Sequence, residues 1–317
     1  MPTKILICSS EVGAGKRGAS LGPDAVRIAA VNLLYNLFYQ IPSDEIKVQK
    51  LNRYSPEYKS AKYIKLIAST HAKICRKMCN THLQGYKTLI FSGDHSNAAG
   101  FISGFREAYP DKKIGVIWID AHGDIHSPYT SPSGNMHGMP IAILLGHDNT
   151  EAHTKKMKPE VIKNWEKIKR TGKSKITPKL LPEDIVYIDI RDLEAQEWAA
   201  IKTLKIKHYT PQDREKKGTQ KIADEVVTYF EGYDGIYVSF DVDSLDPSIS
   251  RGTGTPVEGG LSLEDAKTLL KTFTRMHNFK SLEVTEVNPL LDTENKMATA
   301  VVKILRESLS METLRAV

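Results

Sequence analysis

The chain has few cysteines, and the three that it has are not spaced to hold a structural zinc ion. Their odd number also argues against a disulfide framework. Cys75 and Cys79 lie four residues apart in a predicted helix, so they share one face of it, whereas Cys8 stands alone. The pair is either reactive or ligating, or it consists of two reduced, packed thiols. We expect packed thiols, because free cysteine is among the most buried residue types.

Long apolar runs are absent as well. No stretch approaches the roughly 20 consecutive apolar residues that a membrane-spanning helix needs. Met1–Ser10 enters a strand-like run without the charged start, long apolar core and small-residue cleavage site of a signal peptide. The composition, 40% hydrophobic and 26% charged over 317 residues, is ordinary for a globular protein. We therefore expect a cytoplasmic protein that does not associate with membranes.

The net charge of +6 comes from one segment rather than from the whole surface. Lys155–Lys179 holds ten lysine or arginine residues against two glutamates. The apolar residues at its centre have helical spacing: Val161, Ile162, Trp165 and Ile168. We expect a solvated amphipathic helix within a basic insertion at about 149–180. The alternative is a patch that binds an anion or a partner, and we expect no nucleic-acid binding.

Five strand-like apolar runs share one pattern, because each of them ends in polar or acidic residues. They are Thr88–Ser92, Ile114–Ile119, Ile185–Ile190, Ile236–Phe240 and Leu282–Thr285. Unbroken β-branched runs of this kind are typical of parallel strands that are buried on both faces. Helix-length stretches lie between them: Tyr63–Thr81, Ser96–Ala108, Lys221–Phe230 and Ser262–Met276. The alternation predicts an α/β fold with a parallel sheet, in a single domain spanning residues 1–317.

The acidic residues cluster where the predicted strands end. Ligands of such sheets bind beyond the carboxyl ends of the strands, so residues scattered along the chain would converge there. In an extended segment alternate residues point to the same side, which brings Asp120, His122 and Asp124 together and likewise pairs Asp241 with Asp243. Four crowded carboxylates repel one another unless cations neutralise them.

With His95 the cluster contains four aspartates and two histidines, too many ligands for one small ion but enough for two that share carboxylates. An oxygen-rich set without thiolates favours Mn²⁺-like ions over structural zinc. Two such ions can hold a water between them and deliver hydroxide at neutral pH. The alternative is that these side chains only cap helices and hold turns. Three clusters at equivalent strand ends favour metal binding.

Three motifs resemble the signatures of the ureohydrolase family, which includes the arginases. They are Ser92–Ser96, Asp120–Asp124 and Ser239–Pro247, and their order and separation also match. The similarity extends from Lys16–Gly18 to Glu286–Pro289. It implies a three-layer α/β/α fold with a central, mainly parallel sheet, and a binuclear centre with two Mn²⁺ ions, for which Co²⁺ or Ni²⁺ could substitute.

The resemblance also implies a set of ligands for each ion. One ion would be held by His95, Asp120, Asp124 and Asp241, and the other by His122, Asp120, Asp241 and Asp243. Asp120 and Asp241 would bridge the two ions. Ser92 departs from the family, which usually has glycine there, and this changes a turn beside His95 but no ligand.

Other residues match the family's substrate site. Ser133-Gly134-Asn135-Met136-His137-Gly138 resembles the arginase loop that recognises an α-carboxylate, so Ser133 and Asn135 would contact that group. His137 matches a proposed proton shuttle, and histidine titrates near neutral pH. Glu286 would pair with the planar guanidinium. Thr255 matches a residue that helps to position Glu286, and Asp124 would also orient the attacking hydroxide.

Two positions depart from the commonest arginase pattern. His126 stands where many arginases have asparagine beside the α-carboxylate, and Glu194 stands where they have the aspartate that holds the α-amino group. Some bacterial arginases resemble the chain in having this histidine and an insertion after the His-Gly segment. The resemblance implies hydrolysis of L-arginine to L-ornithine and urea. Alternatives are a formimidoylglutamase, an agmatinase or another amidinohydrolase, and a non-catalytic metal-binding regulator. Family members differ in oligomeric state, so a homo-oligomer is compatible with the resemblance.

Overall fold

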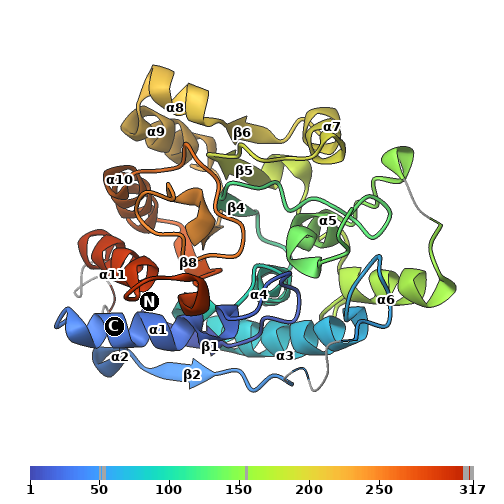
Figure 1. The fold of residues 1–317 in the computed structure, drawn as a ribbon, viewed down its shortest axis with the longest axis horizontal. Coiled ribbons are helices and arrows are strands. Elements are labelled where there is room, and N and C mark those ends of the chain that lie inside the picture. The colour runs from blue at the N-terminus through green and yellow to red at the C-terminus, as the bar shows by residue number, and fades with distance from the viewer. Residues whose placement is uncertain (50, 52–54, 154–155, 310–313, 315–317) are drawn as a thin grey trace.

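The computed structural model describes residues 1–49, 51, 55–153, 156–309 and 314, and shows one eight-stranded sheet within them (Figure 1). The strand order is β2-β1-β3-β8-β7-β4-β5-β6, and every pair of neighbours is parallel. The strands are β1 (Thr3–Cys8), β2 (Ser43–Glu45), β3 (Lys87–Ser92), β4 (Ile114–Ile119), β5 (Ile185–Ile188), β6 (Lys207–Tyr209), β7 (Gly235–Asp241) and β8 (Phe279–Thr285).

Helices connect the strands and cover the sheet. They are α1 (Gly22–Asn32), α2 (Leu37–Gln40), α3 (Ile64–Leu83), α4 (Asn97–Ala108), α5 (Pro140–Leu145), α6 (Pro159–Lys169), α7 (Ala195–Thr203), α8 (Pro211–Lys217), α9 (Thr219–Tyr229), α10 (Leu263–Thr274) and α11 (Lys296–Ser308). The predicted three-layer α/β/α fold with a parallel sheet is therefore confirmed.

Two apolar cores lie on the two faces of the sheet. One contains residues of α1, α9, α10 and α11, and the other contains residues of α3 to α7. Alternate residues of β4 enter opposite cores: Ile117 and Ile119 enter the first, and Val116 and Trp118 enter the second. Because the central strands are buried on both faces, their sequences are continuously apolar and do not alternate.

The predicted elements match the structure with small shifts at their ends. The expected strand Ile185–Ile190 is two residues too long, because Asp189 has a φ of 72° and leaves the extended conformation. Ser262 caps α10 as expected, since its side chain accepts the backbone N–H of Asp265. The short edge strands β2 and β6 were not predicted, and β2 has a wholly polar sequence that carries no strand signal.

The centre of the basic segment forms the amphipathic helix α6. Val161, Trp165 and Ile168 are buried as expected, whereas Ile162 is 38% exposed and does not belong to the apolar face. The prediction of packed thiols is confirmed, because Cys75 and Cys79 are buried and unpaired, and burial raises the pKa of Cys75 to about 12. No helix in the described part of the chain is long and apolar enough to cross a membrane. The single domain and the insertion at 149–180 remain predictions.

Candidate metal centre and substrate pocket

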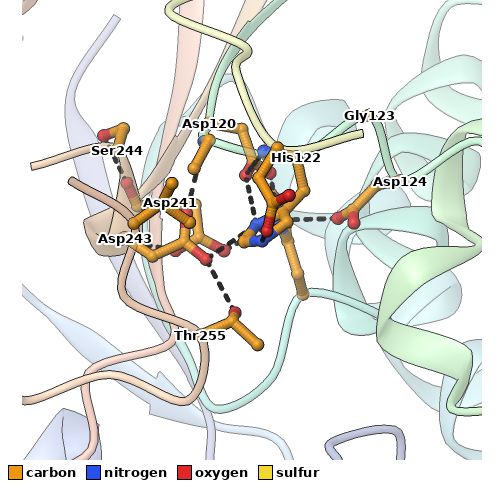
Figure 2. A network of polar contacts seen from close by, with 12 residues as sticks. Asp120, His122, Gly123, Asp124, Asp241, Asp243, Ser244 and Thr255 are labelled. Carbon is orange, nitrogen blue, oxygen red and sulfur yellow. Dashed lines mark hydrogen bonds and ion pairs between the residues drawn. The ribbon is translucent and has the colours of Figure 1, made fainter. Parts of the chain in front are cut away.

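The predicted ligands converge at the carboxyl edge of the sheet. They lie at the last residue of β7 and in the segments that follow β3, β4 and β7, and Glu286 follows β8, which lies between β3 and β7. Figure 2 shows Asp120, Asp241 and Asp243 gathered near His122, with Asp124 pointing towards them from the opposite side. Segments separated by about 150 residues in sequence thus form one acidic cluster, as parallel strand order requires.

The first ligand group surrounds His95. Its Nδ1 lies 3.1 Å from Asp120 Oδ2, 3.0 Å from Asp124 Oδ2 and 3.0 Å from Asp241 Oδ2. The ring stacks on Trp118 with centroids 4.0 Å apart, which fixes its plane. His95, Asp120 and Asp241 each offer a ligand atom close enough to the others for one ion.

The second ligand group surrounds His122. Its Nδ1 lies 3.0 Å from Asp243 Oδ2 and 3.5 Å from Asp120 Oδ1. Asp120, His122 and Asp243 form the second set of converging ligand atoms, so Asp120 contributes one oxygen to each group. This geometry agrees with a carboxylate that bridges two ions.

Backbone amides and an indole hold the carboxylates in place. Asp120 accepts the backbone N–H of His122 at 2.7 Å and the indole N–H of Trp118 at 2.8 Å. Asp241 accepts the backbone N–H of Asp243 at 2.8 Å. Each ligand loop therefore folds back on its own first aspartate. In Asp241 the other oxygen, Oδ2, faces His95, whereas in Asp120 both oxygens accept a hydrogen bond and also face the histidines.

The donor set fits cations. The four carboxylates are buried, and burial together with the charges of Asp243 and Asp120 raises the pKa of Asp241 well above its usual range. His95 Nδ1 faces three carboxylate oxygens yet has no hydrogen-bond partner. A cation at this point would satisfy the imidazole nitrogen and the carboxylates together.

Two of the predicted catalytic residues have unusual backbone conformations. Asp124 has a φ of 49° and Glu286 a φ of 64°, in the left-handed region that residues other than glycine rarely adopt. Strain of this kind costs roughly 1–3 kcal/mol and clusters at functional sites. In both residues it directs a carboxylate into the cluster instead of along the strand.

His137 and Glu286 form a buried pair beside the metal centre. His137 Nδ1 lies 3.1 Å from Glu286 Oε1, and the same oxygen accepts the backbone N–H of His95 at 2.9 Å. Burial lowers the pKa of His137, but the hydrogen bond and charge of Glu286, with the charges of Asp124 and Asp94, outweigh it and raise the pKa to about 9. In this arrangement His137 holds a proton at neutral pH.

A pocket of about 360 Å³ opens onto the centre. Its lining includes most of the predicted site residues: His95, His122, Asp124, His126, Ser133, Asn135, His137, Glu194, Asp241, Asp243 and Thr255. Asp120 and Glu286 are not among its lining residues and are almost wholly buried. The structure thus brings together the predicted metal ligands and the residues expected to bind substrate.

The two positions that depart from the family pattern contact each other. His126 Nε2 lies 2.9 Å from Glu194 Oε2 and 3.6 Å from Glu197 Oε2. Sequence reasoning did not identify Glu197, although it lies three residues after Glu194 on the same helical turn. Histidine and glutamate are longer than the asparagine and aspartate that the family usually has at these positions, and here the two side chains contact each other in the pocket lining.

The loop expected to bind a carboxylate is supported by a lysine that the sequence did not indicate. Lys62 Nζ donates to Asn135 Oδ1 at 2.9 Å, and Ser133 Oγ accepts the backbone N–H of Asn135 at 3.2 Å. The lysine fixes the amide of Asn135 and adds a positive charge to this end of the pocket. Both features suit a substrate carboxylate.

Thr255 contacts a predicted metal ligand. Its hydroxyl donates to Asp243 Oδ2 at 3.0 Å, and its expected part in positioning Glu286 remains a prediction. Arg191 supports the same region, because its guanidinium donates to the backbone oxygens of Asp243 and Val257 at 2.9 and 3.0 Å. It thereby links the ligand loop to the loop that carries Thr255.

The basic helix α6 is joined to the pocket by one aspartate. Trp165 Nε1 and Lys169 Nζ both donate to Asp148 Oδ1, at 2.6 and 2.8 Å. The backbone oxygen of Asp148 in turn accepts the hydroxyl of Ser127, the residue after His126. α6 therefore packs behind the loop that carries His126.

Taken together, the parallel sheet and the two ligand groups are those of a metal-dependent hydrolase. The model of the Arginase family matches residues 5–310. An arginase from Bacillus caldovelox is 33% identical over 308 residues, which cover 96% of each chain. Its solved structure has a TM-score of 0.84 over 97% of each chain. An arginase from Entamoeba histolytica, solved with L-ornithine, has a TM-score of 0.82 at 27% identity and covers 97% of this chain and 98% of its own. The chain belongs to the arginase family.

Proposed function

We propose that the protein hydrolyses L-arginine to L-ornithine and urea. The observation that carries the proposal is the pair of ligand groups around His95 and His122, which share Asp120 and open into the pocket with Glu194 and Asn135. The curated relatives named above are arginases, which supports the same reaction.

The proposed metal centre holds two ions, Mn²⁺ with Co²⁺ or Ni²⁺ as substitutes. One ion would have His95, Asp120, Asp124 and Asp241 as ligands, and the other His122, Asp120, Asp241 and Asp243. When bound, such a pair lowers the pKa of a shared water and supplies a nucleophile at neutral pH. Asp124 would also accept a hydrogen bond from that nucleophile and so orient it.

The remaining residues would hold the substrate and move its proton. Glu286 pairs with the guanidinium, whose planar N–H groups suit a carboxylate. Ser133 and Asn135 hold the α-carboxylate, with His126 beside it, and Glu194 holds the α-amino group. His137 gives a proton to the departing amine, because it lies beside Glu286 and holds a proton at neutral pH. We further propose that the enzyme works in the cytoplasm.

A urea-release assay tests the function directly. The metal-free protein is reconstituted separately with Mn²⁺, Co²⁺ and Ni²⁺ and given arginine, agmatine or N-formimidoylglutamate. We expect urea from arginine with Mn²⁺ and a much lower rate with agmatine. Release of formamide from the formimidoyl substrate alone would indicate a formimidoylglutamase. No turnover of any substrate with any of the metals would overturn the proposal and leave a non-catalytic metal-binding protein.

A further inference from the structure

A glutamate lies buried in the middle of the sheet, directly behind the proposed metal centre. Glu283 is in β8, the strand between β3 and β7, and its exposed fraction is 0%. Three hydroxyls donate to its carboxylate: Ser92 at 2.7 Å, Tyr237 at 2.7 Å and Ser239 at 3.4 Å. A buried carboxyl group in a sheet is costly, so its retention calls for a compensating role.

Ser239 connects this carboxylate to a predicted metal ligand. Its Oγ lies 2.8 Å from His95 Nε2 and also within hydrogen-bond distance of Glu283 Oε2. A serine hydroxyl has a single proton. When that proton is donated to Glu283, the serine oxygen is left to accept the N–H of His95.

This order of donors fixes the histidine tautomer. With the proton on Nε2, His95 Nδ1 carries a lone pair, and Nδ1 is the atom that faces Asp120, Asp124 and Asp241 at 3.0–3.1 Å. Burial raises the pKa of Glu283, while the charge of His95 and the donated hydroxyls act in the opposite direction. The stacked ring of Trp118 restricts His95 to this plane.

We propose that Glu283 is a positioning residue which, through Ser239, holds His95 in the tautomer and orientation that bind metal. The inference rests on the proposed function, because it takes His95 to be a ligand. Histidine ligands commonly donate their second N–H to a carboxylate, directly or through another group, and this strengthens metal binding. Here the carboxylate comes from a different strand and acts through one hydroxyl.

The test measures metal binding rather than turnover. Mn²⁺ is titrated into the metal-free enzyme by calorimetry, and the spin-coupled signal of a manganese pair is followed by electron paramagnetic resonance. We expect Glu283→Gln and Ser239→Ala each to weaken binding at the His95 site by about 10- to 100-fold. The double variant should bind no more weakly than the weaker single variant, because both changes break the same chain of hydrogen bonds.

The matched control is Thr88→Val. Thr88 in β3 donates to Ser281 in β8 at 2.9 Å. The variant therefore also removes a buried hydroxyl that is hydrogen-bonded to β8, but it leaves Glu283 untouched. It should melt at a lower temperature and bind Mn²⁺ with wild-type affinity. If Glu283→Gln does not fold, Ser239→Ala decides the question alone.

Wild-type Mn²⁺ affinity in both Glu283→Gln and Ser239→Ala would overturn the inference. So would an equal loss of affinity in Thr88→Val, because the effect would then come from the sheet in general. If the wild-type protein binds manganese tightly but releases no urea, the proposed reaction is wrong while the role of Glu283 is still tested by the affinities. If the wild-type protein binds none of Mn²⁺, Co²⁺ and Ni²⁺, both proposals are overturned.

Discussion

A single carboxylate oxygen of Glu286 contacts both the proposed proton donor and the backbone of a proposed metal ligand, at 3.1 Å from His137 Nδ1 and 2.9 Å from the N–H of His95. The geometry couples the position of the His137 side chain to the loop after β3. It also leaves the second oxygen of Glu286 for the guanidinium of a substrate.

Replacing His137 should slow the reaction without preventing substrate binding. General acid catalysis typically contributes about 10²–10⁴-fold, so we expect kcat of His137→Asn to fall by at least about 100-fold while KM changes little. The measurement is steady-state urea release with the manganese enzyme. The exposed His277 offers a matched control, since His277→Asn should retain wild-type kcat. A wild-type kcat in His137→Asn would exclude this proton donor.

Removing one ligand group should remove one ion. Treatment with a chelator should abolish urea release, and added Mn²⁺ should restore it as two ions bind per chain. Asp243→Ala removes a carboxylate from the His122 group alone, so the titration should show one tight ion instead of two. The exposed Asp224 provides the control variant Asp224→Ala, which should bind two. Two tight ions in Asp243→Ala would contradict the ligand assignment.

The sequence predicted a parallel sheet, because its strands are buried on both faces and therefore appear as unbroken apolar runs. It also predicted that the acidic residues at the ends of these runs converge, since the carboxyl ends of parallel strands lie at one edge of the sheet. It did not predict the exposure of Ile162, which depends on how α6 packs against the rest of the fold. Nor did it predict that β5 ends at Ile188, because Asp189 takes its left-handed conformation from contacts with Arg191 and Arg214 at 2.9 Å.

Side-chain contacts between segments far apart in the chain could not be predicted from the sequence either. Lys62 reaches Asn135 across 73 positions, and no local pattern indicates that contact. Glu283 did leave a signal, since a charged residue inside an apolar strand has to be paired or functional. Its link to His95 through Ser239 became apparent only from the register of β8 against β7.

The α-carboxylate end of the pocket should determine the preference for arginine over agmatine. Agmatine keeps the amino group but lacks the carboxylate, so Asn135→Ala should raise KM for arginine roughly tenfold or more and leave KM for agmatine nearly unchanged. Glu194→Gln should raise KM for both substrates, because both present an amine to it. Parallel kinetics on the two substrates make this measurement. An equal rise for arginine and agmatine in Asn135→Ala would exclude the carboxylate contact.

The hydrogen bonds that join α6 to Asp148 should contribute to the stability of the protein. Asp148→Ala leaves the indole of Trp165 and the ammonium of Lys169 without their shared acceptor, and hydrogen bonds to charged groups are each worth about 1.5–3 kcal/mol. We expect the free energy of unfolding to fall by about 2 kcal/mol in urea denaturation. Lys163→Ala, on the exposed face of the same helix, should change it by less than about 0.5 kcal/mol. An unchanged midpoint in Asp148→Ala would show that other contacts hold the helix.

Two buried histidines should make the protein less stable in mild acid. Burial lowers the pKa of His71 to about 4 and that of His82 to about 3, whereas an unfolded histidine titrates near 6.5. Below pH 6.5 each of these two histidines therefore binds more protons in the unfolded chain than in the folded one, so each lowers the free energy of unfolding as the pH falls. Each histidine contributes about 1.4 kcal/mol per pH unit once the pH is well below 6.5, until the folded pKa is reached.

Urea denaturation of the metal-free protein at pH 7.5, 6.5, 5.5 and 4.5 measures this slope without a contribution from metal release. His71→Leu removes one of the two groups and should flatten the slope between pH 6 and pH 4.5 by about 1.4 kcal/mol per unit. His277→Ala, at an exposed position, should leave the slope unchanged. If the slope of His71→Leu equals that of the wild type, protonation of His71 costs nothing extra in the folded protein, and the prediction for His71 is wrong.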